Sequence, residues 1–305
     1  MKSEKGLIVV GFILISIIWG STWLVIKIGL ESITPFYGIA IRFTIASVIL
    51  FLIMRIRGDK FFLDQTSLLL YMNLAVLSFS IPFALVYWGE QYIASGLASV
   101  LFAAYPFVVA IGSHLFLSTE KLNIYKTAGI MLGFLGVLII FWSDVNSGTN
   151  NVLGMAAILA STVMQGISLV IVKRVNHHIS PTSLSLGGMV LGIVIMYPIA
   201  LIFEDFSLLR FDTKGIGSIL YLGTFGTVIT FVVYYWLLKR VEVVYLSLVS
   251  FVTPVLAVIL GALWLQETLS SHIYVGGGMV LFGILIANGK DLTTMLQLRR
   301  ARFFF

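Results

Sequence analysis

Cysteine is absent from the 305-residue chain, and charged side chains make up only 10% of it. The lack of thiols excludes disulfides, iron–sulfur clusters and thiolate chemistry. Soluble domains carry about 25% charged residues, so an ordinary soluble globule is excluded too. A disordered chain would need high charge and low hydrophobicity, whereas this chain is 59% hydrophobic. The composition is therefore that of a membrane protein.

The net charge of +6 could suggest nucleic acid as a partner. However, the basic residues do not gather on one amphipathic surface. They punctuate long apolar stretches, which is the membrane pattern. We therefore expect a lipid bilayer around the protein and no nucleic-acid partner.

Ten segments are apolar and long enough to cross a membrane, since a helix of about 20 residues spans a hydrocarbon core of roughly 30 Å. The first is too long for the apolar region of a signal peptide and has no cleavage site after it, so it should remain in the mature protein. The predicted fold class is all-α and polytopic. The expected spans are 7–27, 35–54, 68–88, 92–117, 122–142, 152–172, 182–203, 215–237, 243–265 and 270–289.

Basic residues predict the orientation, because short cytoplasmic loops retain lysine and arginine. With the amino terminus inside, fifteen basic residues fall on the cytoplasmic side and two, Arg210 and Lys214, on the other. Lys27 lies at the outer end of the first span and Arg42 inside the second. We expect a cell-membrane protein with both termini in the cytoplasm, in agreement with an even number of crossings.

The two halves of the chain repeat each other at a nearly constant offset of about 147 residues. We interpret this as a duplication of five spans, with repeats at 1–143 and 152–289 and a cytoplasmic tail at 290–305. The matches pair Gly20, Lys27 and Pro35 with Gly166, Lys173 and Pro181; Tyr87, Trp88, Ser99 and Pro106 with Tyr235, Trp236, Ser247 and Pro254; and Glu120, Leu122, Gly129 and Gly136 with Glu267, Leu269, Gly276 and Gly283.

Five spans are an odd number, so the second repeat must enter the membrane from the opposite side. Inverted repeats place a substrate site near the bilayer midplane and let one half rock against the other. The architecture therefore favours a transporter, although channels and some membrane enzymes are duplicated as well. The sequence contains no HExxH, Walker or G-x-S-x-G motif. We expect no enzyme activity, no cofactor and no metal site.

Several motifs point to one family. The first span carries Trp19-Gly-Ser-Thr-Trp-Leu-Val-Ile-Lys27, followed by Pro35 and Ile41-Arg-Phe43. The segments 94–140 and 243–287 each combine a mid-helix proline with Glu-Lys-Leu or Glu-Thr-Leu before a glycine-rich helix. This pattern resembles the EamA-type transporters of the drug/metabolite transporter superfamily. The resemblance implies ten helices, a central cavity, and export or exchange of small metabolites, often amino acids or related compounds.

Pro106 and Pro254 lie near the middle of spans four and nine. Proline removes an intrahelical hydrogen bond and kinks a helix. Each is either a packed kink or a hinge beside the cavity, and their equivalent positions favour the hinge. Helical spacing places polar or aromatic residues on the same faces, which we predict to line the cavity. They are Ser99 and Phe102 in the first repeat and Ser247 and Ser250 in the second.

Spans one and six also carry polar residues. Gln165, near midplane, should face protein or water rather than lipid, and Trp19 is its counterpart. The two either contact a substrate from opposite halves or join helices by contacts worth about 0.6 kcal/mol. Spans three and eight have polar stripes that are not equivalent, and Tyr87 could instead belong to an interfacial aromatic belt. The remaining cavity candidates are Thr22, Ser168, Asn73, Ser80, Tyr87 and Thr227.

Arg42 is the most deeply placed charge, about seven residues into span two. A lone guanidinium at the membrane centre costs about 2.5–3.5 kcal/mol, and less nearer the interface. Arg42 should therefore pair with Glu31 or reach the outer surface, or else bind a substrate carboxylate, as arginine does through two parallel hydrogen bonds.

All thirteen acidic residues fall in loops or within a turn of a predicted helix end, so we expect no relay of buried carboxylates. His114, expected to be buried near the inner end of span four, is the candidate for proton coupling unless its role is structural. Two rival functions remain. A sugar-phosphate or nucleotide-sugar antiporter would need several inward basic groups, and a membrane enzyme or assembly factor would need a catalytic cluster.

Overall fold

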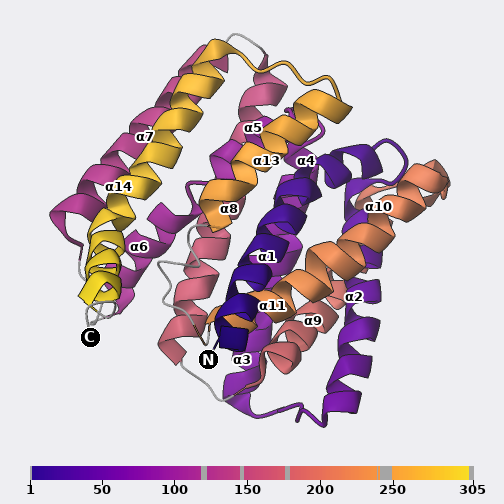
Figure 1. Cartoon of the computed structure of the whole chain (residues 1–305). Coiled ribbons are helices and arrows are strands. Elements are labelled where there is room, and N and C mark those ends of the chain that lie inside the picture. The colour runs from indigo at the N-terminus through magenta and orange to yellow at the C-terminus, as the bar shows by residue number, and fades with distance from the viewer. Residues whose placement is uncertain are drawn as a thin grey trace.

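The computed structural model describes residues 2–117, 122–144, 148–175, 179–238, 240 and 249–301. In these ranges the chain forms helices and no β-strand (Figure 1). The helices of the first repeat are α1 (Lys2–Gly29), α2 (Pro35–Arg57), α3 (Gln65–Leu74), α4 (Ile81–Gly89), α5 (Ser95–Phe102), α6 (Tyr105–Phe116) and α7 (Ile124–Asp144). Those of the second are α8 (Thr149–Val175), α9 (Pro181–Phe203), the short η3 (Phe206–Leu208), α10 (Thr213–Gly223), α11 (Thr230–Leu238), α13 (Val249–Trp264) and α14 (Ser271–Ala301).

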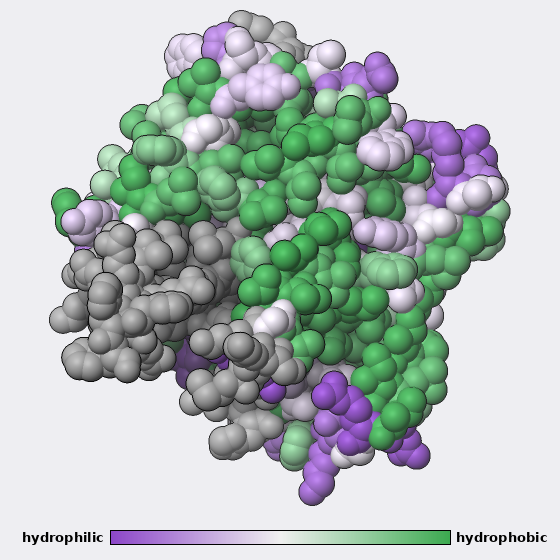
Figure 2. All heavy atoms as spheres, viewed as in Figure 1, coloured by the Kyte–Doolittle hydropathy of each residue, from purple (hydrophilic) through white to green (hydrophobic). Residues whose placement is uncertain are grey.

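Eight segments in the described ranges are long and apolar enough to cross a membrane, and the shorter apolar helices Val249–Trp264 and Ser271–Ala287 complete the predicted ten. The prediction of an all-α, ten-span fold is therefore confirmed. α1 begins and α14 ends at the same end of the bundle, which we call the terminal end, and the opposite end is the far end (Figure 1). Between the two ends the visible surface is largely hydrophobic, as a bilayer requires (Figure 2).

Spans two and seven begin with the same local signal. Pro35 follows Thr34 at the start of α2, and Pro181 follows Ser180 at the start of α9. Proline suits a first helical turn because that position has no N–H bond to lose and needs the φ that proline already has. At α9 the Ser180 hydroxyl also accepts a hydrogen bond from the N–H of Ser183 at 3.1 Å. The repeated signal starts equivalent helices in the two halves.

Span four consists of two helices. α5 ends at Phe102 and α6 begins at Tyr105, so Pro106 lies in the first turn of a new helix. The interruption of span four next to Pro106 agrees with the predicted break in the helix, and the role of Pro106 as a hinge stays a prediction. Proline is tolerated in a first turn because the N–H it lacks would have no helical acceptor there. Pro254, by contrast, does lie inside α13 and is buried.

Spans three and eight each contain a π-helical segment that the sequence pattern did not predict. These segments are η1 (Ala75–Ser80) and η4 (Thr224–Ile229), 149 residues apart (224 − 75 = 149). The wider turn of a π-helix rotates the following side chains relative to an ideal α-helix, and such segments occur frequently at functional sites. Because both repeats contain one at an equivalent place, α-helical spacing cannot be continued unchanged through either span.

The last spans of the two repeats, α7 and α14, pack with their backbones almost in contact. A Cβ atom at Gly129 would lie 2.3 Å from the carbonyl oxygen of Gly283, and one at Gly276 would lie 2.6 Å from that of Gly136. Exchange of the repeats converts one of these contacts into the other, as a two-fold axis between the halves requires. Small residues allow this close approach in lipid.

Candidate functional site

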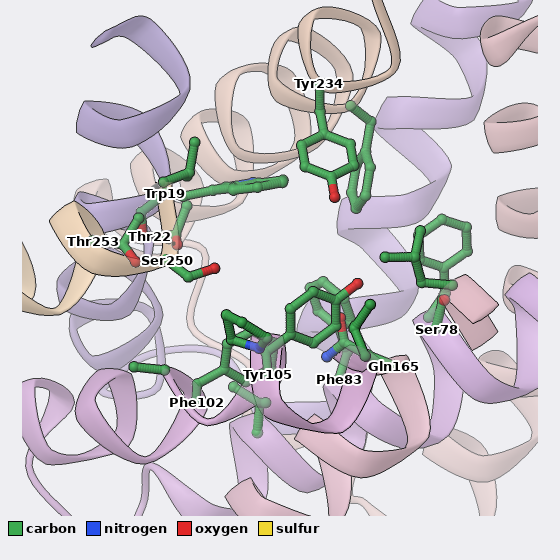
Figure 3. A pocket seen from close by; sticks show the side chains of 18 of the residues that line it. Trp19, Thr22, Ser78, Phe83, Phe102, Tyr105, Gln165, Tyr234, Ser250 and Thr253 are labelled. Carbon is green, nitrogen blue, oxygen red and sulfur yellow. Dashed lines mark hydrogen bonds between the residues drawn. The ribbon is translucent and has the colours of Figure 1, made fainter. Parts of the chain in front are cut away.

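A cavity of about 600 Å³ lies between the two repeats (Figure 3). The first repeat contributes residues of α1, α2, the end of α3, η1, α4, the break between α5 and α6, and the start of α7. The second contributes residues of α8, η4, α11 and α13. The volume falls within the roughly 300–1,000 Å³ of typical small-molecule sites. The break in span four is thus part of the cavity wall.

Aromatic rings form two opposite parts of this wall. Trp19 lies 5.2 Å from Tyr234 and 5.9 Å from Phe231 between ring centroids. On the other side of the cavity, Phe102 and Tyr105 stack with centroids 5.8 Å apart (Figure 3). Aromatic side chains offer large apolar faces, and the tyrosine hydroxyls add polar groups. The wall therefore suits a ligand with an apolar or aromatic body.

Three basic side chains line the cavity, and none of the described lining residues is acidic. Lys126 and Lys173 lie toward the terminal end, at the start of α7 and the end of α8. Arg42 lies about 10 Å along α2 from the far end, at 1.5 Å per residue. Cavities lined by charge of one sign concentrate ligands of the opposite sign. The site therefore favours an anionic group on the ligand.

Arg42 is 2% exposed and is held by hydrogen bonds that cross between the repeats. Its Nε donates to the hydroxyl of Thr227 at 2.8 Å, and its Nη2 donates to the carbonyl of Gly226 at 3.2 Å. Its Nη1 donates to the Tyr87 hydroxyl at 3.2 Å. The guanidinium carbon lies 4.7 Å from the ring centre of Phe83, in cation–π geometry. Two of these partners belong to η4, so the π-helical segment helps to hold the charge.

Two of the three alternatives predicted for Arg42 are wrong, because its side chain neither pairs with Glu31 nor reaches the surface. Glu31 instead forms an exposed ion pair with Lys214 at 2.5 Å. The sequence could not show that α2 turns Arg42 toward the second repeat. A guanidinium has five N–H groups, so three hydrogen bonds leave donors for a ligand in the cavity that Arg42 lines.

Of the thirteen predicted cavity residues, twelve are described and six of these are in the wall; their contact with a ligand stays a prediction. Ser247 lies outside the described residues. Those in the wall are Trp19, Thr22, Arg42, Phe102, Gln165 and Ser250, together with the hinge candidate Pro106. The structure places the others away from the lining: Asn73, Ser80, Tyr87, Ser99, Ser168 and Thr227, and the second hinge candidate, Pro254.

Several of the candidates that do not line the cavity form hydrogen bonds behind its wall. The Ser168 hydroxyl accepts a hydrogen bond from the Asn73 amide at 2.9 Å and is bonded to the Ser78 hydroxyl at 2.7 Å. Ser78 itself lines the cavity, although no stripe on span three predicted it. It belongs to η1, where the π-helical turn changes the direction in which the side chains point. Its counterpart at the offset of 149 is Thr227, which bonds Arg42 instead.

His114 is exposed rather than buried, and it is not part of the cavity wall. Its Nδ1 accepts a hydrogen bond from the backbone N–H of Leu122 at 3.3 Å. The prediction of a buried histidine placed for proton coupling is therefore wrong. The neighbouring Ser113 is buried, so the inward side of α6 at this point is taken by Ser113 and the side chain of His114 points away from it.

Two carboxylates of the second repeat cap helices of the first at the far end. Glu204 accepts hydrogen bonds from two backbone N–H groups in the first turn of α2, at 2.8 and 2.9 Å. Glu267 accepts from the N–H groups of Ser95 and Gly96, in the first turn of α5, at 2.8 and 3.1 Å. Carboxylates are favourable at helix N-termini, where N–H groups lack partners. These caps join the two halves beyond the cavity.

We expect Glu267→Ala to lower the thermal unfolding temperature more than Glu31→Ala. The first change leaves two helix N–H groups and the Ser95 hydroxyl without their acceptor, and losing a helix cap costs about 0.5–2 kcal/mol. The second removes an exposed ion pair with Lys214, worth about 0–1 kcal/mol. Thermal melts of the detergent-solubilised variants measure both. Equal losses would show that the cap contributes no more than a surface charge.

The fold and site define a multi-pass membrane protein with a ligand-sized cavity between two inverted repeats. Residues 6–142 and 152–289 each match the EamA-like transporter family, and the chain belongs to that family. The resemblance drawn from its motifs is thereby confirmed. Membership supports a general role in membrane transport.

The curated relatives carry transporter names or no functional name. An uncharacterized transporter of Bacillus subtilis, YoaV, is 30% identical over 92% of this chain and 96% of its own. An uncharacterized inner membrane transporter of Escherichia coli, YedA, is 29% identical over 90% and 89%, and protein PagO of Salmonella typhimurium is 29% identical over 86% of both. A crystal structure covering 94% of this chain and 98% of its own aligns with a TM-score of 0.69 at 18% identity, which shows a common fold.

Proposed function

We propose that this protein exports or exchanges small carboxylate-bearing metabolites, amino acids or related compounds, by alternating access through the cavity. We further propose that it does so in the cell membrane with both termini in the cytoplasm. The observation that carries the proposal is a cavity between inverted repeats with basic and aromatic lining residues and no acidic one among those described. Inverted repeats support rocking of one half against the other around a fixed site.

The ligand carboxylate would lie at Arg42. Arginine binds carboxylates through charge-assisted hydrogen bonds, which are about twice as strong as neutral ones. The aromatic groups around Trp19 and Phe102 would contact the rest of the molecule. Because Arg42 is bonded to Thr227 of the other repeat, a ligand that competes for its N–H groups weakens a contact between the halves. Ligand binding and rocking would then be coupled.

A second candidate function is antiport of sugar phosphates or nucleotide sugars. Such an antiporter needs several basic groups that face the cavity, and the cavity wall contains Lys126 and Lys173 as well as Arg42. Lysine binds phosphate as a point charge. This candidate places the phosphate toward the terminal end, whereas the first places the carboxylate nearer the far end.

Counterflow in proteoliposomes tests the proposal without an assumed driving force. Vesicles are loaded with unlabelled phenylalanine, glutamate or glucose 6-phosphate, and uptake of the same labelled compound is followed. We expect counterflow of a carboxylate above that of protein-free vesicles, and less of it for Trp19→Ala. Counterflow of glucose 6-phosphate alone would favour the second candidate. No counterflow with any carboxylate or phosphate in an enlarged panel would contradict both.

A further inference from the structure

Glu90 is a buried carboxyl group that has no part in the cavity wall or in capping. It follows the last residue of α4 directly, at the far end, and its side chain is 0% exposed. Among the residues that the structure describes, neither carboxyl oxygen has a hydrogen-bond partner, unlike the oxygens of Glu204 and Glu267. A buried ionised carboxylate costs several kcal/mol unless donors or a cation compensate it. The surroundings of Glu90 thus favour the neutral acid.

Lys27 of α1 approaches Glu90 but is bonded to the backbone. Its ammonium donates to the carbonyl of Glu90 and, at 2.9 Å, to the carbonyl of Ile93. A lysine at the C-terminal end of a helix satisfies carbonyls that lack helical partners. Lys27 therefore holds the turn between α4 and α5 instead of neutralising the carboxyl group beside it.

Titratable and charged groups face Glu90 from several elements. Lys27 on α1 and Arg42 on α2 are positive, Glu267 after α13 is negative, and Tyr87 lies one turn earlier on α4. The residues of α8 nearest to Gly89, which precedes Glu90, are Gly154 and Ile158, and neither is charged. Burial raises the pKa of Glu90 well above its ordinary value, and the opposing charge of Lys27 does not offset that effect.

We propose that Glu90 is a proton-binding site, protonated in the arrangement described here and ionised in a second one in which the far end is open. On ionisation the proton leaves to water at the opening far end, and the carboxylate draws the Lys27 ammonium away from the backbone carbonyls. The turn between α4 and α5 then loses its anchor, next to the point where Glu267 joins α5 to the second repeat. Rebinding of a proton restores the joined state.

This proposal corrects the expectation that no buried carboxylate is available for energy coupling. Glu90 does lie at a helix end, as its place in the sequence indicates. However, α1 and the second repeat pack around that end and remove it from solvent. The link between the proton and a substrate rests on the proposed transport function, whereas the proton site itself does not.

Infrared difference spectroscopy on the full chain in lipid nanodiscs tests the proton site. We expect the wild type to show the carbonyl stretch of a protonated carboxylic acid at neutral pH and to lose it as the pH is raised. Glu90→Gln should lack this band. The control Glu31→Gln, which removes an exposed carboxylate paired with Lys214, should retain it. A wild type without the band, or a Glu90→Gln protein that retains it in full, would overturn the proposal.

A second variant keeps the test valid if Glu90→Gln does not fold. Lys27→Met removes a positive charge that favours the ionised form, so the band should disappear at a higher pH than in the wild type. If the band disappeared at the same pH as in the wild type or at a lower pH, the proposed effect of Lys27 on Glu90 would be contradicted. These measurements use no substrate. Failure of counterflow and failure of the proton site are therefore separate results.

Discussion

Replacing Arg42 by alanine is expected to reduce binding and counterflow of a carboxylate substrate by about 10- to 100-fold. A hydrogen bond to a charged group contributes about 1.5–3 kcal/mol, and each 1.4 kcal/mol is a factor of ten in affinity. The change also leaves the carbonyl of Gly226 and the hydroxyls of Tyr87 and Thr227 without this donor. Counterflow with the most active probe, measured per folded transporter, gives the effect.

Arg42→Lys and Arg210→Ala are the controls for this result. Lysine keeps the positive charge but not the planar fork that bonds Thr227 and Gly226 together, so we expect an intermediate activity. Arg210, near the far end, does not line the cavity and should be dispensable for binding. Wild-type counterflow by Arg42→Ala would exclude contact with the substrate. If Arg42→Ala lowered the melting temperature but not counterflow, the role of Arg42 would be only to hold the two repeats together.

Substituting Gly276 by alanine is expected to destabilise the pair formed by α7 and α14. The added Cβ would lie 2.6 Å from the carbonyl oxygen of Gly136 and 2.7 Å from the Ile140 side chain. Neither backbone can move without shifting a whole helix. Overpacking of this kind costs about 1–3 kcal/mol. Thermal unfolding of the detergent-solubilised protein measures the loss.

The same helix offers a matched control. A Cβ atom at Gly278 would meet no atom of the described residues within 4 Å, so Gly278→Ala should leave stability unchanged or slightly higher, because alanine is the better helix former. The inverted symmetry adds a second expectation, since Gly129 is the counterpart of Gly276. Gly129→Ala should therefore cause a comparable loss. Equal stability of the Gly276 and Gly278 variants would contradict backbone contact between the two helices.

Much of the architecture could be predicted from the sequence. Ten apolar segments and a constant offset between motifs indicate ten spans in two inverted repeats, because the length of an apolar run is a local property of the chain. The hydroxyl–proline pair before spans two and seven also marks helix starts locally. The two shorter apolar helices, Val249–Trp264 and Ser271–Ala287, fall within the predicted spans 243–265 and 270–289, which were recognised by their apolar length.

The cavity wall was predicted less well, because it depends on which side of each helix points toward the cavity. Spans one and six are continuous helices, and three of their four candidates, Trp19, Thr22 and Gln165, do line the cavity. The fourth, Ser168, lies away from the lining. On span three a π-helical segment interrupts the α-helical spacing, so Ser78 was missed and Ser80 was wrongly placed in the wall. No residue pattern on spans three and eight indicates the π-helical segment in advance.

Composition, span length and internal repetition determine from the sequence alone that this is a ten-span membrane protein built from inverted halves. The tertiary structure decides which side chains meet. Arg42 is held by Thr227, a residue 185 positions away in the other repeat. Glu90 becomes a buried acid only because α1 and the second repeat close around a helix end. Burial and the partner of a charge come from packing between segments distant in the chain, and apolar spans do not encode that packing locally.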